Sequence, residues 1–326
     1  MRRFGKWLGR VILVLFALFG TIWFLAPVEP VDREIAFDPD TLGADLDAYL
    51  LAAEQQFSDI IPGAAKRIVW AGGKGAKTPL AVIYLHGFSA TAEEVRPLPD
   101  QVASALGANL YFTRLAGHGR GGAAMAEPLA GDWIEDLAEA MAIGRRLGDR
   151  VLVIATSTGG TLAAIGATDP ALADGLAGIV MISPNFGVKS LAGKILDMPF
   201  ARLWGPVVAG ETRSFAPANE GQAKYWTTSY PTTALFPMAA LVRAARAADL
   251  SAAKAPLLVL FSPQDQVVDP AKTLATLATW GGAARLEPRE MGPGDDAYDH
   301  VIAGDILSPG QTASSVALIL DWAKGL

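Results

Sequence analysis

The residue types that could carry covalent chemistry stand next to the predicted ends of strands. Ser157 follows the apolar run 151–155 (VLVIA) and precedes a pair of glycines in the order ATSTGG. A serine hydroxyl becomes a nucleophile when a histidine takes its proton, an acid orients that histidine, and backbone N–H groups hold the oxyanion. A sharp strand-to-helix turn would raise this side chain above the carboxyl edge of a sheet, where open α/β folds place ligands. We therefore expect Ser157 to be a nucleophile; the alternative is that it is only the first polar residue of a loop.

Three histidines could serve as the base: His86, His118 and His300. His300 is preferred because it follows the last predicted strand, 285–290, and precedes the last predicted helix, 311–326. This order places it over the same edge of the sheet as Ser157. His86 is expected to support its own turn by hydrogen bonding.

The acid expected to orient His300 is Asp265, a few residues past the predicted strand 256–261. Asp269 is the second candidate, although an aspartate directly before a proline suits the N-cap of a helix. Three aspartates close to His300 are interpreted as turn residues: Asp295, Asp296 and Asp299. An aspartate bonded to one imidazole nitrogen fixes the tautomer and stabilises the imidazolium formed when the serine loses its proton.

Two backbone N–H groups are expected to form an oxyanion hole. Phe88 lies in the turn LHGF after the predicted strand 81–85, and Thr158 begins the segment behind Ser157. In folds of this kind, N–H groups face the developing negative charge from two places. One is a turn after an early strand, and the other is the N-terminus of the helix that follows the nucleophile.

Short apolar runs alternate with segments of helical periodicity. The predicted strands are 81–85, 109–113, 151–155, 178–182, 256–261 and 285–290, and the predicted helices are 92–106, 132–147, 159–168 and 311–326. This alternation predicts an α/β fold with a mostly parallel sheet and helices on both faces. Residues 184–255 interrupt the alternation and are too long for an ordinary loop, so we expect a helical cap insertion there.

The N-terminus combines a basic flank with an uncharged apolar run. Four basic residues precede residues 11–26: Arg2, Arg3, Lys6 and Arg10. We predict a membrane anchor in residues 1–26, with the remainder extracytoplasmic (periplasmic in a bacterium) by the positive-inside rule. The alternatives are a cleaved signal peptide and a buried core helix. Residues 27–40, rich in proline and acid, are predicted to be a linker, and residues 41–326 the folded domain.

Composition excludes several classes of protein. The formal net charge is −6 with no basic run beyond the N-terminus, so nucleic acid is not an expected partner. No cysteine is present, which excludes disulfides and a thiol nucleophile. The three histidines stand in separate loops without ligand spacing, so no metal and no other cofactor is expected.

The residues singled out above resemble motifs of the α/β-hydrolase superfamily, in particular the serine hydrolases of the monoacylglycerol lipase, carboxylesterase and serine aminopeptidase S33-like group. The motifs are LHGF (85–88), GHG (117–119), ATSTGG (155–160), SPQDQVVD (262–269) and DH (299–300). The resemblance covers residues 66–326 and implies the α/β-hydrolase fold, a cap at 184–255, Ser157, Asp265 and His300 as catalytic residues, and Phe88 and Thr158 as oxyanion donors. Two departures are alanine at position 155, usually glycine, and TRLA before GHG, where many relatives carry an acidic residue.

The function expected from these features is hydrolysis of carboxylic esters, with lipophilic acyl esters or monoacylglycerol-like substrates favoured by the apolar cap and the membrane anchor. A peptidase or amidase is the nearest alternative, because the same residues can cleave amides. A noncatalytic binding module with this fold is a second alternative, since fold alone does not establish activity.

Overall fold

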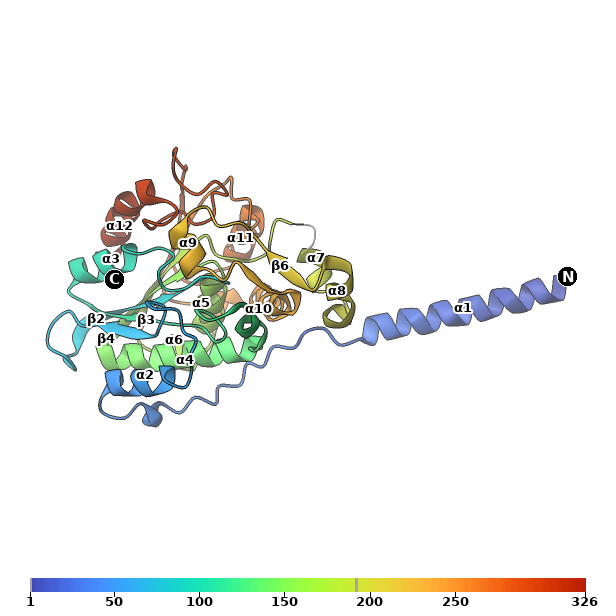
Figure 1. Cartoon of the computed structure of the whole chain (residues 1–326), viewed down its shortest axis with the longest axis horizontal. Coiled ribbons are helices and arrows are strands. Elements are labelled where there is room, and N and C mark those ends of the chain that lie inside the picture. Colours follow the sequence, from blue (N-terminus) through green and yellow to red (C-terminus); the bar gives the residue numbers. More distant parts are fainter. Residues whose placement is uncertain (1, 191–192) are drawn as a thin grey trace.

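A seven-stranded sheet forms the centre of the computed structural model, which describes residues 2–190 and 193–326 (Figure 1). The strand order is β1-β3-β2-β4-β5-β8-β9, and every neighbouring pair is parallel except β1 with β3. The strands are β1 (Arg67–Val69), β2 (Thr78–Leu85), β3 (Asn109–Phe112), β4 (Gly148–Thr156), β5 (Leu176–Ile182), β8 (Leu257–Phe261) and β9 (Ala284–Pro288). The predicted mostly parallel sheet is confirmed, with an antiparallel edge strand added.

Both faces of the sheet are buried, which is why its central strands read as continuous apolar runs. In β4, Val151 and Val153 belong to one core, whereas Leu152 and Ile154 belong to the core on the opposite face. Side chains alternate between faces along a strand, so a run without polar residues requires cover on both sides.

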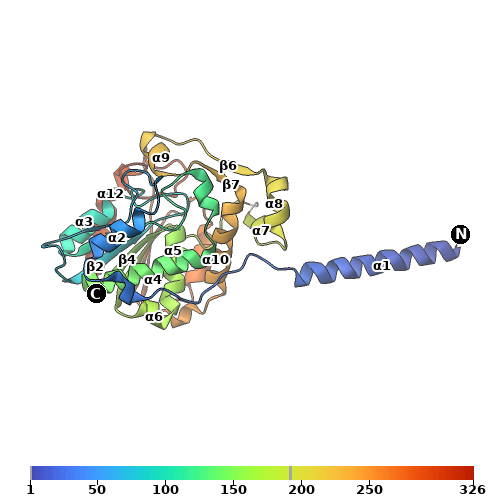
Figure 2. The same ribbon diagram turned by 60° about the horizontal axis from the view of Figure 1, so that its bottom comes forward.

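Helices supply that cover (Figure 2). One core includes residues of α4, α5 and α10, and the other includes residues of α3 and α12. The bounds are α3 (Leu98–Leu106), α4 (Ala130–Leu147), α5 (Thr158–Thr168), α10 (Leu235–Ala247) and α12 (Pro309–Ala323). Shorter elements complete this part of the fold: η1 (Pro39–Leu42), α2 (Leu46–Glu54), η2 (Gly122–Ala126), α6 (Pro170–Ala173), η4 (Leu250–Ala252) and α11 (Pro270–Leu277).

Two local predictions differ from the structure. The helix predicted over 92–106 begins only at Leu98. Pro97 is the cause, because proline disfavours helical backbone in the residue before it and cannot donate an N–H. Strand β1 was not predicted, since it is only three residues long and begins with an arginine.

Residues between β5 and β8 form a mostly helical layer at the carboxyl ends of the strands (Figure 1). Its described elements are α7 (Gly193–Leu196), α8 (Ala201–Ala209), β6 (Thr212–Ser214), α9 (Glu220–Tyr225), β7 (Ser229–Pro231), η3 (Thr232–Ala234), α10 and η4. Strands β6 and β7 pair as a separate antiparallel hairpin. The span 184–255 remains the predicted extent of the cap, and its residues 191 and 192 lie outside the described part.

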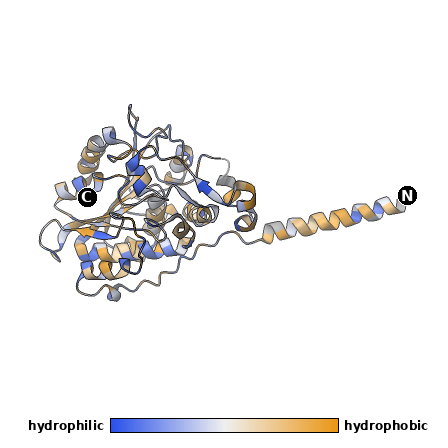
Figure 3. Ribbon diagram, viewed as in Figure 1, coloured by the Kyte–Doolittle hydropathy of each residue, from blue (hydrophilic) through white to orange (hydrophobic). Residues whose placement is uncertain are grey.

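The N-terminal helix α1 (Arg2–Leu25) projects from the rest of the chain (Figures 1 and 2). By length and composition, the segment Phe4–Ile22 could cross a membrane, and it is not buried against the rest of the protein. Colouring by hydropathy shows the apolar character of α1 (Figure 3). The predicted linker is bonded to the domain, because Glu135 in α4 accepts the N–H groups of Ala36 and Phe37.

Candidate active site

Ser157 occupies a single-residue turn between β4 and α5. Its backbone has φ 49° and ψ −111°, a conformation that L-residues rarely adopt and that persists only when neighbours enforce it. Its N–H donates to Ile182 O at 2.9 Å, and its carbonyl accepts the N–H of Asn185 at 3.0 Å. A side chain on Gly159 would place Cβ 2.3 Å from Leu85 O, so glycine is required for the helix to pass this close.

The structure brings Ser157, His300 and Asp265 into one hydrogen-bonded chain. His300 Nε2 lies 3.1 Å from Ser157 Oγ, and His300 Nδ1 lies 2.8 Å from Asp265 Oδ2. Because the carboxylate only accepts, Nδ1 carries the proton and Nε2 is free to accept the serine proton. The sequence separations are 143 and 35 residues, so the fold alone assembles this group.

Asp265 is held independently of the histidine. Its Oδ1 accepts the N–H groups of Val267 at 2.8 Å and Val268 at 2.9 Å, which leaves Oδ2 directed at His300. The loops that carry the two residues are tied together by a bond from Gln266 N to Tyr298 O of 2.9 Å. Burial lowers the pKa of His300, but the charge and hydrogen bond of Asp265 together with the charges of Asp296 and Glu94 raise the pKa above its ordinary value of 6.5.

The other aspartates have structural partners. Asp269 caps α11 by accepting Ala271 N at 3.1 Å. Asp296 accepts the backbone N–H of His300 at 3.1 Å and thereby positions its loop, whereas Asp295 bonds to Gly292 N at 2.8 Å. These contacts agree with the cap and turn interpretations.

Thr158 directly follows Ser157, and Phe88 lies in a neighbouring turn. The turn of Phe88 passes close to Ser157, since a Cβ on Gly87 would lie 3.3 Å from Ser157 Cβ. Within residues 2–190 and 193–326, neither the N–H of Phe88 nor that of Thr158 donates to a protein backbone acceptor. Thr158 is the first residue of α5, where an N–H has no intrahelical partner. Both groups can therefore serve an oxyanion.

A buried glutamate beside this turn was missed by sequence reasoning. Glu94 Oε1 accepts Gly87 N at 2.6 Å and Tyr84 OH at 2.7 Å, and Tyr84 OH also lies 2.8 Å from Thr156 Oγ1. The network links the turn of Phe88 to the residue before Ser157. Burial raises the pKa of Glu94 to about 7. In the sequence, Glu94 follows another glutamate at a predicted helix start, where a solvated carboxylate is the ordinary expectation.

The remaining histidines are buried supports. His86 donates from Nδ1 to Gly87 O at 2.9 Å and accepts Leu115 N on Nε2 at 3.0 Å, which is the turn-supporting role predicted for it. Burial lowers its pKa to about 3 and that of His118 to about 4. Both rings are therefore neutral near pH 7. Among the described residues, no group of three or more His, Cys, Asp or Glu side chains is placed to hold a metal ion.

The segment around β7 covers the turn that holds Phe88. Thr227 N donates to Ser89 O at 2.7 Å, and the ring of Tyr230 packs edge-on against Phe88 at 5.4 Å between centroids. Ser157 is 7% exposed. Ser157 is therefore largely shielded from bulk water.

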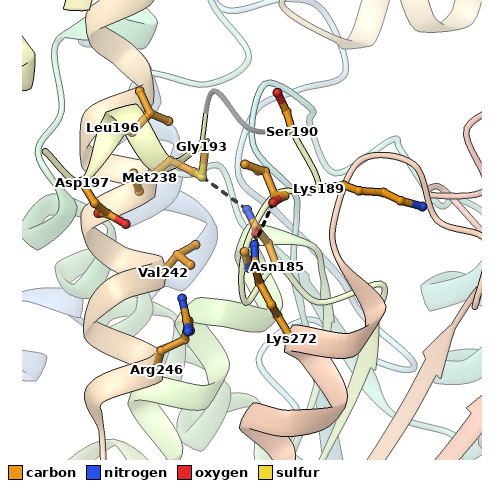
Figure 4. A pocket seen from close by; sticks show the side chains of 13 residues that line it. Asn185, Lys189, Ser190, Gly193, Leu196, Asp197, Met238, Val242, Arg246 and Lys272 are labelled. Atoms are coloured by element: carbon orange, nitrogen blue, oxygen red, sulfur yellow. Dashed lines mark hydrogen bonds between the residues drawn. The ribbon is translucent and has the colours of Figure 1, made fainter.

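A pocket lies between α7, α10 and α11 (Figure 4). Asn185 connects it to the site, because its backbone bonds to Ser157 O while its side chain contacts Met238 Sδ at 3.3 Å. Ser157, Asp265 and His300 do not line it. We therefore do not assign the scissile bond to this pocket.

A family model described as serine aminopeptidase, S33 matches residues 76–286. No curated protein sequence matches the chain significantly. The matched span includes Ser157 and Asp265 and ends before His300, which the fold adds to the site.

Many solved structures share the fold. One comes from a study of LipS and LipT, two metagenome-derived lipolytic enzymes, with 21% identity, TM-score 0.63, and coverage of 82% of this chain and 100% of that chain. Monoacylglycerol lipase from Paleococcus ferrophilus has 15% identity, TM-score 0.56, and coverage of 79% and 97%. Monoglyceride lipase from Saccharomyces cerevisiae, solved with a substrate analog, has 12% identity, TM-score 0.59, and coverage of 80% and 90%. At these identities the likeness establishes the α/β-hydrolase fold.

Proposed function

Because the chain belongs to the serine aminopeptidase S33 family of α/β hydrolases, we propose that it is a serine hydrolase that cleaves carboxylic esters of lipophilic acids. The observation that carries this proposal is the hydrogen-bonded chain from Ser157 Oγ through His300 to Asp265 Oδ2. Preference for lipophilic esters is supported by the lipase and esterase neighbours.

In the first half of the reaction, Ser157 Oγ attacks the ester carbonyl carbon while His300 Nε2 takes the hydroxyl proton. The carbonyl oxygen becomes an oxyanion that accepts the N–H groups of Phe88 and Thr158. His300 then gives its proton to the leaving alkoxide, the C–O bond breaks, and an alcohol departs. The acid remains bound as an ester of Ser157.

Water completes the second half of the reaction. His300 Nε2 accepts a proton from a water molecule, whose oxygen attacks the acyl carbon. The second tetrahedral intermediate collapses, and the proton returns to Ser157 Oγ. The carboxylic acid then leaves. Asp265 stabilises the imidazolium in both halves without taking its proton.

We further propose that α1 anchors the chain in a membrane, with the hydrolase domain on the extracytoplasmic side. The uncharged run and its cationic flank support this topology. A signal sequence passes the same test of length and composition, and the apparent mass of the mature chain distinguishes the two.

A peptidase would need an acidic side chain that receives a substrate's amino group. In the predicted cap, Asp197 pairs with Arg243 at 2.8 Å, and Glu220 lies in the exposed first turn of α9. Their contacts give no specific reason to prefer amides. The intact hydrogen-bonded chain likewise gives no reason to prefer a noncatalytic module.

The test compares p-nitrophenyl esters of graded acyl length with the matching p-nitroanilides, using the full chain in detergent. We expect ester hydrolysis that rises with chain length, little anilide hydrolysis, and a loss of about 10⁶ in kcat for Ser157→Ala. Ser104→Ala, at an exposed position of α3, is the matched control and should keep full activity. Faster cleavage of anilides than of esters would support the amidase, and activity retained in Ser157→Ala would refute the proposed nucleophile.

A further inference from the structure

The cap helix α8 exposes an apolar face. Leu203 is 76% exposed, Val207 84% and Val208 68%. The opposite face, formed by Ala201 and Gly205, is buried. Leu203 and Val207 are four residues apart and thus share one face of the helix. A contiguous apolar face of this kind marks an interaction surface, whereas single exposed apolar residues do not.

The buried face of α8 is packed against the cap. A Cβ on Gly205 would lie 2.8 Å from the ring of Phe236 in α10, so that side of α8 leaves no room for another partner. The preceding residues Met198 and Phe200 are also exposed. Between positions 198 and 210 the only charged residue is Arg202, which pairs with Glu29.

The anchor leaves the domain beside this helix. Phe200 N donates to Pro27 O at 3.4 Å, and the backbone carbonyl of Glu29 accepts a guanidinium N–H of Arg243 in α10. Figures 1 and 2 both place α8 next to the C-terminal end of α1. The link between α1 and the cap is therefore short and bonded.

The chain length limits the distance between α8 and a bilayer. From Ile22, the last residue of the candidate span, three helical residues rise about 4.5 Å and two extended residues add about 7 Å. Pro27 then lies within roughly 12 Å of the hydrocarbon edge, and an interfacial region is itself about 5–7 Å deep. A helix about 10–12 Å across that is bonded to Pro27 thus lies at the membrane surface.

We propose that α8 is a second membrane contact, in which the apolar face with Leu203 and Val207 inserts into the interface of the bilayer that holds α1. This inference rests on the proposed anchor and extends the proposed function, because it turns the cap toward the phase in which lipophilic esters reside. The contact that we propose is apolar. The protein carries a net charge of −6, so attraction to anionic lipid is not expected to hold the cap at the membrane.

The absence of cysteine permits a direct test with the full chain. Single variants Val207→Cys in α8, Val14→Cys in α1 and Leu51→Cys in α2 each take one environment-sensitive fluorophore. Leu51 is 59% exposed and lies on a helix far from α1, so it is the matched control (Figure 1). The labelled chains are placed in phosphatidylcholine nanodiscs with and without nitroxide-labelled lipid.

We expect nitroxide lipid to quench the label at positions 14 and 207 and to leave the label at position 51 unchanged. Equal, weak quenching at positions 207 and 51 would overturn the proposal. A blue-shifted but unquenched label at position 207 would show that protein covers the face, for example a second copy of the chain, and would also overturn it. An unquenched label at position 14 would remove its premise.

A second measurement uses activity. The double variant Leu203→Ser and Val207→Ser should hydrolyse a long-chain monoacylglycerol embedded in nanodiscs several-fold more slowly than the unmodified chain, and a soluble short-chain ester at the same rate. Equal loss on both substrates would contradict a role in membrane contact. If no ester is cleaved at all, the proposed function fails, while the quenching data still decide the membrane contact.

Discussion

The buried carboxyl of Glu94 offers a quantitative test of what holds the turn of Phe88, the proposed oxyanion donor, in place. In Glu94→Ala the N–H of Gly87 loses its 2.6 Å acceptor, whereas Tyr84 keeps Thr156. An unsatisfied buried donor costs about 1–3 kcal/mol, so the turn should relax to find another partner. Phe88 is the next residue, and loss of one oxyanion donor raises the barrier by about 2.7–4 kcal/mol. We therefore expect kcat to fall about 10²- to 10³-fold.

The assay separates this positioning role from simple destabilisation. Active sites are titrated with a fluorophosphonate, and kcat and KM are measured per titrated site on a soluble ester, together with Tm. Because an oxyanion donor acts in the transition state, kcat should fall while KM changes little. Glu94→Gln keeps an acceptor for Gly87 and should stay within about tenfold of the unmodified chain. Unchanged kcat per site in Glu94→Ala would refute the reasoning.

Three further predictions follow from the site and its support. The raised pKa of His300 places the acid limb of the kcat/KM profile above pH 6.5, because His300 must be neutral to act as the base. In Asp265→Asn this limb should move to lower pH and kcat should fall about 10⁴-fold. An acid limb that stays at the same pH in the variant would contradict this reasoning. Gly159→Ala should abolish soluble expression or activity, because its Cβ would meet a backbone oxygen at 2.3 Å; normal kcat and Tm would show that the turn is more adaptable. Glu54→Ala should lower the free energy of unfolding, measured with denaturant, by about 3–5 kcal/mol, because the buried guanidinium of Arg114 loses the carboxylate that lies 2.7 Å from it. A change below about 1 kcal/mol would argue against that pairing.

The mostly parallel sheet could be predicted from the sequence because each of its central strands contains an uninterrupted apolar run. Ser157 comes at the end of such a run and Asp265 a few residues after one, so their place at the carboxyl edge follows from parallel strand direction. Asp265 could be preferred over Asp269 because a proline follows Asp269, and the structure shows that helix cap. The catalytic roles of these residues, as distinct from their positions, stay predictions.

Other features depend on contacts that local patterns do not encode. Glu94 is paired with a tyrosine and a backbone N–H that belong to other segments, and its own neighbourhood reads as an exposed helix start. Arg114, in the TRLA segment that departs from many relatives, is neutralised by Glu54 from α2, some sixty residues earlier. The apolar residues of α8 read as core residues in the sequence, and only the packed cap shows that they face outward.

Covalent labelling tests the central claim most directly. The full chain is treated with a fluorophosphonate, digested, and mapped by mass spectrometry beside Ser157→Ala and His300→Ala. The account predicts one phosphonylated residue, Ser157, no labelling in Ser157→Ala and strongly slowed labelling in His300→Ala. A label on a different serine, or none on a folded chain, would contradict the proposed nucleophile.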